Sequence, residues 1–179
     1  MGFVEHLRDL IQGFAPEDHT EAKHHQRIVD LLALGDQAIR RDHYTPGHIT
    51  ASAFVLSPEK DALLLIFHSK LHRWLQPGGH IDADDTDVLS ACLREVAEET
   101  GVTQLECIGG VFDVDVHDIP SSPKGPGHQH FDVRFLFRAI SRDAKAGSDA
   151  MDAKWVPLNQ VQHIESDASV MRAVRKLTG

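Results

Sequence analysis

The stretch that most constrains this chain is residues 77–102, a Pro-Gly-Gly turn followed by an acidic cluster and a helical pattern. Thr86 or Asp87 is suited to begin the helix, because short polar side chains cap the free backbone N–H groups of a first turn. Apolar residues then recur at three- and four-residue spacing and predict one buried helical face: Val88, Ala91, Cys92 and Val96. Gly101 is placed to end the helix in a left-handed conformation.

The last turn of this predicted helix carries three glutamates on one face, Glu95, Glu98 and Glu99. Like-charged neighbours at this spacing cost about 0.2–0.5 kcal/mol per pair, and anions at a helix C-terminus add about 0.3–1 kcal/mol each. A hard divalent cation among the carboxylates would explain the cluster, because Mg²⁺ binds carboxylates together with waters and substrate phosphates. The alternative is a solvated acidic helix end that Arg94 partly neutralises.

Residues 79–102 resemble the Nudix box, G-x5-E-x7-R-E-U-x-E-E-x-G-U, in which U is a bulky aliphatic residue. The matching positions are Gly79, Arg94, Glu95, Val96, Glu98, Glu99, Gly101 and Val102. The chain departs from the pattern in two ways: Asp85 takes the first acidic position, and eight residues rather than seven separate it from Arg94. We expect the extra residue to lengthen the loop before the helix, with Asp85, Asp84 or Thr86 as the partner of Arg94.

The resemblance implies hydrolysis of a diphosphate linked to another moiety, with Mg²⁺ as the cofactor and Mn²⁺ as a substitute. It implies four metal ligands: the side chains of Glu95, Glu98 and Glu99 and the backbone carbonyl of Gly79 or its neighbour. Arg94 would orient the glutamates, and Glu98 or Glu95 would act as general base. Further candidate bases outside the box are Asp149 and Asp152 in a loop, and Asp113 and Asp115 on a strand.

Three residues are candidates for contact with the substrate. His80 follows the glycine pair, while His130 and Asp132 share one face of a predicted strand. Two other functions remain as hypotheses. One is a non-catalytic nucleotide-sensing module, although the chain keeps all three glutamates of the box end. The other is an isopentenyl diphosphate isomerase-like enzyme, although no cysteine precedes the box.

The resemblance implies an α/β (α+β) fold, an α/β/α sandwich around a mixed sheet. We expect a helical extension at residues 1–40, packed on a Nudix domain at residues 41–179; its helices would otherwise serve as a dimerisation arm or a lid. The patterns predict a hairpin with strands at 49–56 and 62–68, and further strands at 104–116, 130–139 and 151–156. Ser166 is expected to cap the last helix.

Charge and composition restrict the partners. The net charge of −9 argues against passive binding to nucleic acid or anionic lipid, and no apolar run is long enough to span a membrane. The N-terminus does not read as a signal peptide. Cys92 and Cys107 are both expected to be buried and free, which fits a reducing cytoplasm. We therefore expect a cytoplasmic enzyme for a small diphosphate-containing substrate, with a homodimer as one arrangement open to it.

Overall fold

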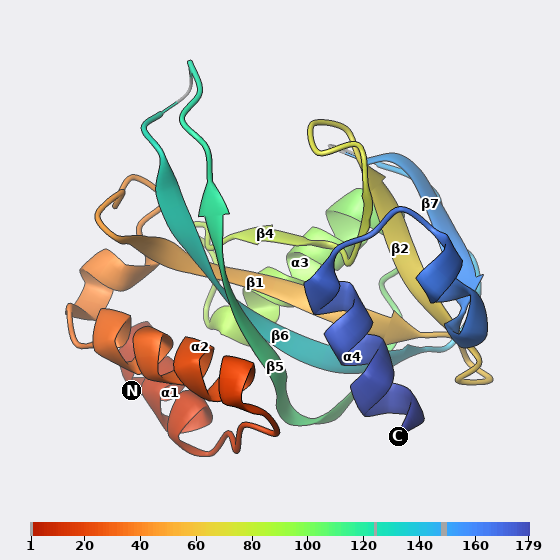
Figure 1. The fold of residues 1–179 in the computed structure, drawn as a ribbon, viewed down its shortest axis with the longest axis horizontal. Helices are drawn as coiled ribbons and strands as arrows, with labels where there is room; N and C mark the ends of the chain where they lie inside the picture. Colours follow the sequence, from red (N-terminus) through yellow and green to blue (C-terminus); the bar gives the residue numbers. More distant parts are fainter. Residues whose placement is uncertain (1, 124, 148–149) are drawn as a thin grey trace. The chain divides into compact units, whose positions relative to one another are not determined.

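A seven-stranded sheet forms the centre of the computed structural model, which describes residues 2–123, 125–147 and 150–179 (Figure 1). Its strands run in the order β3-β2-β1-β6-β5, with β4 paired to β1 and β7 paired to β2. Their bounds are β1 Gly47–Leu56, β2 Ala62–His68, β3 Trp74–Leu75, β4 Gly78–His80, β5 Leu105–Ile119, β6 His128–Ala139 and β7 Ala150–Pro157. The helices are α1 Phe3–Gln12, α2 His19–Leu32, α3 Val88–Thr100 and α4 Ala168–Thr178, with short 3-10 segments η1 Gly35–Ile39 and η2 Leu158–His163. The expected α+β class with a mixed sheet is confirmed.

The predicted hairpin is present as β1 and β2, which pair antiparallel with Val55 opposite Leu64. All ten residues of β1 are buried, and so are the first five of β2. A strand buried on both faces has a continuous apolar run, and this is the pattern that identified β2 in the sequence. On its other side β2 pairs with β7, which places Leu64 opposite Trp155.

By its contacts the chain divides into two units, and each is described by itself. The first comprises Met1–Ala51, Gly79–Ala91 and Gly110–Arg134, and the second comprises Ser52–Gly78, Cys92–Gly109 and Phe135–Gly179. The units are defined by spatial contacts rather than by a single point along the chain. The expected boundary at residue 40 therefore stays a prediction.

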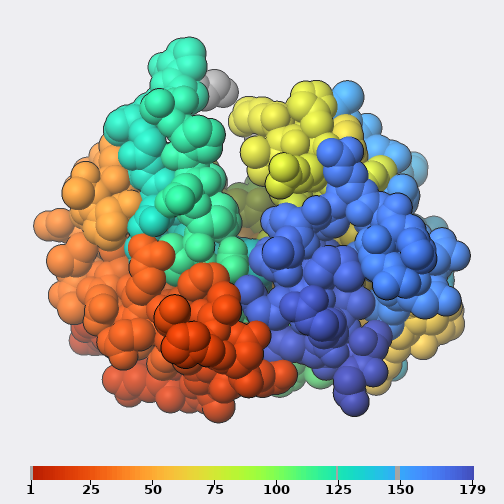
Figure 2. Space-filling model, viewed as in Figure 1, coloured from red at the N-terminus to blue at the C-terminus, as the bar shows by residue number. Residues whose placement is uncertain are grey.

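In the first unit, helices α1 and α2 follow each other in sequence and contact each other at the surface, red to orange in Figure 2. The apolar face of each helix is buried: Val4, Leu7 and Ile11 of α1, and Ile28, Leu31 and Leu32 of α2. Asp18 caps α2 by accepting a hydrogen bond of 2.8 Å from the Glu21 N–H.

Helix α2 also contacts strands β5 and β6 of the same unit. Arg27 donates a hydrogen bond to the Gln129 side chain, and its guanidinium carbon lies 5.4 Å from the centre of the Phe131 ring. The Nδ1 atom of His24 is 3.3 Å from the Asp115 carboxylate. The second N-terminal helix is thus attached to the sheet by polar and aromatic contacts.

In the second unit, both tryptophans of the chain lie beside basic side chains. The Lys154 ammonium is 3.8 Å from the centre of the half-buried Trp74 ring, and Arg142 lies 5.9 Å from the Trp155 ring. The Trp155 indole donates a hydrogen bond of 2.9 Å to the Arg142 carbonyl. Cation–π contacts of this kind contribute about 0.5–1 kcal/mol at exposed sites.

Two local predictions were wrong. Asp167, not Ser166, caps α4, because its carboxylate accepts from the backbone N–H groups of Ser169 and Val170 at 3.0 and 2.9 Å. Ser166 instead donates to the Trp74 carbonyl. Cys107 is exposed rather than buried, whereas Cys92 is buried as expected. None of the helices in the described part of the chain has the length and apolar character to cross a membrane.

Candidate functional site

Helix α3 carries the candidate metal-binding residues, and residues adjacent to it in sequence mark both of its ends. At the start, the Asp87 carboxylate accepts a hydrogen bond of 2.7 Å from the Ser90 N–H, and the Asp87 N–H donates to the Ser90 hydroxyl at 3.0 Å. At the end, Gly101 adopts φ +70°, and its N–H bonds the Ala97 carbonyl. The sequence prediction of a cap at Thr86 or Asp87 and a left-handed terminal glycine agrees with this geometry.

The three glutamates of the last turn differ in exposure. Glu99 is buried, with 4% of its surface exposed, and its carboxylate accepts a hydrogen bond of 2.9 Å from the Gly78 N–H. Glu95 is half-buried and Glu98 is exposed. Arg94 contacts both of these, with its Nη1 atom 2.9 Å from Glu95 and 3.4 Å from Glu98.

A segment remote in sequence completes the C-terminus of α3 within the second unit. The Lys145 N–H donates to the Thr100 carbonyl at 2.8 Å, and the Gly147 N–H donates to the Glu99 carbonyl at 2.9 Å. These bonds satisfy carbonyl groups that a helix end leaves without an intrahelical partner. Gly147 lies so close to the helix that a Cβ atom built on it would be 2.3 Å from the Glu98 carbonyl oxygen.

The donor set in this turn fits a hard divalent cation. Glu95, Glu98 and Glu99 lie near the C-terminus of α3 and supply carboxylate oxygens, which are ligands of the kind that Mg²⁺ and Mn²⁺ prefer. Arg94 holds Glu95 and Glu98 on the same side of the helix, while the Gly78 N–H fixes Glu99. The turn therefore carries three carboxylates, each with a partner that restrains its side chain.

The other predicted metal-binding and substrate-binding residues lie in the first unit. Gly79 and His80 belong to β4, and His130 and Asp132 belong to β6. The structure brings His80 and His130 together, with ring centres 5.1 Å apart. In the acidic loop, the Asp85 carboxylate accepts a hydrogen bond of 2.8 Å from the Asp82 N–H.

His80 and His130 belong to a larger group that sequence reasoning did not assemble, the histidine cluster of His48, His80, His117, His128 and His130. Burial lowers the pKa of His80 to about 4 and that of His130 to about 2, with further lowering from neighbouring histidines. Burial also lowers the pKa of His48. These three imidazoles are therefore neutral at pH 7. One signal was available in the sequence: His128 and His130 alternate on β6, so their side chains share a face.

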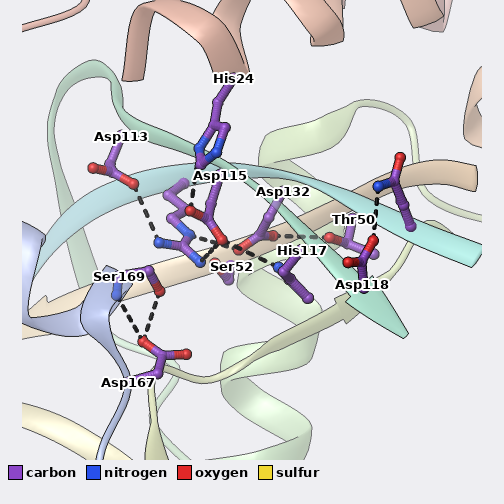
Figure 3. Close-up of polar contacts among 12 residues, drawn as sticks. His24, Thr50, Ser52, Asp113, Asp115, His117, Asp118, Asp132, Asp167 and Ser169 are labelled. Atoms are coloured by element: carbon purple, nitrogen blue, oxygen red, sulfur yellow. Dashed lines mark hydrogen bonds and ion pairs between the residues drawn. The ribbon is translucent and has the colours of Figure 1, made fainter. Parts of the chain in front are cut away.

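Asp132 lies in a buried charge network drawn in Figure 3. Its carboxylate is 2.7 Å from Nε of Arg134 and accepts a hydrogen bond of 2.9 Å from the Thr50 hydroxyl. Arg134 also contacts Asp113 at 3.2 Å and Asp115 at 3.4 Å. Burial lowers the pKa of the Arg134 guanidinium, but the charges of the three aspartates outweigh that effect and raise it.

This network accounts for two of the candidate general bases. Asp113 and Asp115 are buried, and both carboxylates bind Arg134. The Asp115 carboxylate also lies 3.2 Å from Nδ1 of His117 (Figure 3). Asp152 is exposed on β7, where it accepts from the Ala153 N–H, and Asp149 lies outside the described residues.

The fold agrees with the comparisons to known proteins. The family model described as NUDIX domain matches residues 46–176, and the chain belongs to that family. It is 30% identical over 115 residues to an ADP-ribose pyrophosphatase of Methanocaldococcus jannaschii, covering 61% of this chain and 63% of that protein. It is also 30% identical over 100 residues to an RNA pyrophosphohydrolase of Acidiphilium cryptum, covering 50% of this chain and 60% of that protein.

The chain thus spans less than two thirds of the length of these curated relatives. Among solved structures, it resembles a NUDIX-family hydrolase from Clostridium perfringens with a TM-score of 0.56 and 22% identity. That match covers 73% of this chain and 96% of the other. At this identity the likeness supports the fold.

Proposed function

We propose that this chain is a Mg²⁺-dependent pyrophosphohydrolase that cleaves a phosphoanhydride in a nucleoside diphosphate-linked small molecule. The observation that carries the proposal is the last turn of α3, where Arg94 contacts Glu95 and Glu98 and the Gly78 N–H binds Glu99. The relatives support the reaction class, since the matching proteins are a pyrophosphatase for ADP-ribose and a pyrophosphohydrolase for RNA. The net charge of −9 favours a small substrate such as ADP-ribose over an RNA end.

In this proposal Glu95, Glu98 and Glu99 hold Mg²⁺ or Mn²⁺, with Gly79 as the backbone ligand predicted from the sequence. The bound cation would neutralise charge on the diphosphate oxygens and lower the pKa of a water molecule. Glu98 is the most exposed of the three and is our first candidate for the base that takes a proton from the attacking water, with Glu95 as the alternative. Arg94 acts as a positioning residue, because it contacts the two glutamates.

We assign substrate binding to His80, His130 and Asp132. Neutral imidazoles can donate or accept a hydrogen bond and can stack on a planar group, which suits recognition of a nucleoside. Asp132 is two residues from His130 on the same face of β6 and is held there by Arg134 and Thr50. A chain with two cysteines and no disulfide framework suits a cytoplasmic location, and residues 1–40 serve in this view as a helical extension of the hydrolase domain at 41–179.

The test is to replace metal-binding carboxylates by their amides and to measure hydrolysis of ADP-ribose, a dinucleoside polyphosphate and a nucleoside triphosphate with Mg²⁺. Glu98→Gln and Glu99→Gln should each lower kcat/KM by about 10²–10³-fold, because an amide keeps the shape but loses the charge that binds the cation. The matched control is Glu106→Gln, which removes an exposed carboxylate of the same unit that pairs with Arg138. It should leave hydrolysis unchanged.

Three outcomes would each contradict the proposal. Equal rates for wild type and both amide variants would rule out the α3 turn as the metal site. Tight binding of ADP-ribose without turnover in Mg²⁺ or Mn²⁺ would instead favour a nucleotide-sensing module. Isomerisation of isopentenyl diphosphate by the pure protein would favour the isomerase-like alternative.

A further inference from the structure

The histidine cluster brings together side chains from four strands of the first unit. His48 belongs to β1, and its ring centre lies 5.0 Å from those of both His128 and His130 on β6. His80 of β4 lies 5.1 Å from His48 and from His130. Buried polar groups that lack a hydrogen-bond partner are costly, at about 1–3 kcal/mol for each group. A ligand that binds such ring nitrogens would remove that cost.

Three members of the cluster converge through their nitrogen atoms. One ring nitrogen from each of His48, His128 and His130 lies within 4.8 Å of the other two. Histidine nitrogens bound to tetrahedral zinc at about 2.0–2.1 Å are roughly 3.4 Å apart. Small side-chain rotations would therefore bring the three nitrogens to a common ion.

Hydrogen bonds already set the tautomers that such a site needs. Nδ1 of His48 is 3.0 Å from the His43 carbonyl, and Nδ1 of His128 is 2.9 Å from the Pro126 carbonyl. A carbonyl can only accept, so both Nδ1 atoms carry the proton and both Nε2 atoms present a lone pair. Ligating histidines in metalloproteins are oriented in this way by a backbone carbonyl or a carboxylate.

The lone pairs that result are buried without a hydrogen-bond partner. Within the part of the chain that the structure describes, neither Nε2 of His48 nor Nε2 of His128 has such a partner. The His48 residue is almost completely buried, with 1% of its surface exposed. His128 and His130 are half-buried, so an ion can reach the group from solvent.

We propose that His48, His128 and His130 form a zinc site, with a fourth coordination position left for water. An all-imidazole donor set suits Zn²⁺ and related transition metals, whereas Mg²⁺ requires oxygen ligands. The site is thus chemically different from the carboxylate site of α3. It shares His130 with the proposed substrate-binding residues, but Zn²⁺ binding there does not depend on the proposed hydrolase activity. His117 is outside the triad, because its Nδ1 atom is 3.2 Å from the Asp115 carboxylate (Figure 3).

The test uses protein without a histidine tag that has been stripped of metal with a chelator. Separate metal-free samples are titrated with Zn²⁺ and with Co²⁺, each in excess Mg²⁺. The excess Mg²⁺ occupies carboxylate sites, and Co²⁺ reports geometry because its visible absorption is much stronger in tetrahedral than in octahedral coordination. We expect one equivalent of Zn²⁺ per chain and a tetrahedral Co²⁺ spectrum. Loss of an outer-shell partner weakens metal binding by about 10–100-fold. His130→Asn and His128→Asn each remove a direct ligand, so each should weaken Zn²⁺ binding by more than that.

Two controls distinguish Zn²⁺ binding at this triad from binding at a surface histidine or at the glutamates of α3. His163→Asn removes an exposed histidine of the second unit and should leave Zn²⁺ affinity unchanged. Glu98→Gln should lower kcat/KM for hydrolysis by about 10²–10³-fold but keep the tetrahedral Co²⁺ spectrum, so failure of the hydrolase proposal would not affect this one.

Both triad variants change half-buried positions, and circular dichroism of the metal-free proteins checks that they fold. The proposal is overturned if folded His130→Asn and His128→Asn bind Zn²⁺ as tightly as wild type. It is also overturned if Co²⁺ gives an octahedral spectrum.

Discussion

Arg134 shows how a single buried positive charge can bind three aspartates of β5 and β6. The residue is 1% exposed and binds the carboxylates of Asp113, Asp115 and Asp132. Removing a guanidinium from water costs several kcal/mol, and only a well-formed set of anions offsets that cost. The network is therefore sensitive to the loss of its cation, since three buried carboxylates would then repel one another.

We predict that Arg134→Met lowers the free energy of unfolding by about 3–5 kcal/mol, because methionine keeps much of the volume but removes the positive charge that three buried carboxylates share. Arg138→Met on the same strand is the matched control. Its pair with Glu106 is 37% and 56% exposed, so we expect a loss below about 1 kcal/mol. Urea denaturation of both variants measures these changes in the free energy of unfolding.

Arg134→Lys refines this test, because lysine keeps the charge but cannot bind several carboxylates with one rigid fork. Its stability should lie between wild type and Arg134→Met. Equal losses at positions 134 and 138 would contradict the interpretation of the network.

At the level of the element, α3 depends on a segment that lies far from it in sequence. The N–H groups of Lys145 and Gly147 donate hydrogen bonds to the carbonyls of Thr100 and Glu99, in the turn that carries the glutamates. The helix end that carries the candidate ligands is thus held from outside the helix, and its position depends on the close approach of Gly147.

We predict that Gly147→Ala destabilises the protein by about 1–3 kcal/mol and weakens Mg²⁺ binding, because the new methyl group would overlap the Glu98 carbonyl. Gly110→Ala is the matched control: nothing lies within 4 Å of its added Cβ, so its stability should be close to wild type. Thermal unfolding and Mg²⁺ titration measure the two effects. Unchanged Mg²⁺ affinity in Gly147→Ala would show that the segment does not position the ligands.

Local sequence patterns predicted the elements well where the signal was itself local. The Asp87 cap, the Gly101 terminus and the buried β2 strand all follow from residues adjacent in sequence. The Ser166 prediction failed because Ser166 and Asp167 are both suited to cap a helix. Ser166 donates its hydroxyl to the Trp74 carbonyl instead, and Asp167 caps α4. The role of Gly147 was not predictable, since it depends on a tertiary contact.

The same distinction applies to the candidate site. The glutamates of α3 lie within one turn, so their proximity follows from helix geometry alone. The histidine cluster draws its members from β1, β4, β5 and β6, and only the pairing of those strands brings them together. His48 therefore gave no signal in the sequence, although it is one of the most buried histidines of the cluster.

For the molecule as a whole, the histidine cluster predicts a stability that depends on pH. His80 has a pKa of about 4 when folded and about 6.5 when unfolded, so between these values the unfolded chain binds more protons. The stability that neutral His80 supports is complete above pH 6.5 and is lost as the pH falls towards 4. His48 and His130 act in the same direction, because burial also lowers their pKa values.

His117 acts in the opposite direction. Burial lowers its pKa, but the hydrogen bond to Asp115 and the charge of Asp132 outweigh burial and raise it. Its contribution is complete below pH 6.5 and is lost as the pH rises through its folded pKa. Three histidines with lowered pKa values against one with a raised pKa give a net loss of stability in acid.

We predict that the metal-free protein is less stable at pH 5 than at pH 7, and that His80→Asn reduces this difference by about 1–2 kcal/mol. Urea denaturation at both pH values, in the presence of a chelator, measures it. An equal pH dependence in wild type and His80→Asn would contradict the assignment of His80 as a buried neutral group.

The placement of the aromatic residues gives each unit its own optical reporter. Both tryptophans, Trp74 and Trp155, lie in the second unit, whereas the chain's one tyrosine, Tyr44, lies in the first, 5.1 Å from the His128 ring. Selective excitation of tryptophan would therefore follow unfolding of the second unit, and tyrosine emission would follow the first. Transitions that coincide at the two wavelengths would show that the units unfold together, without any label or substitution.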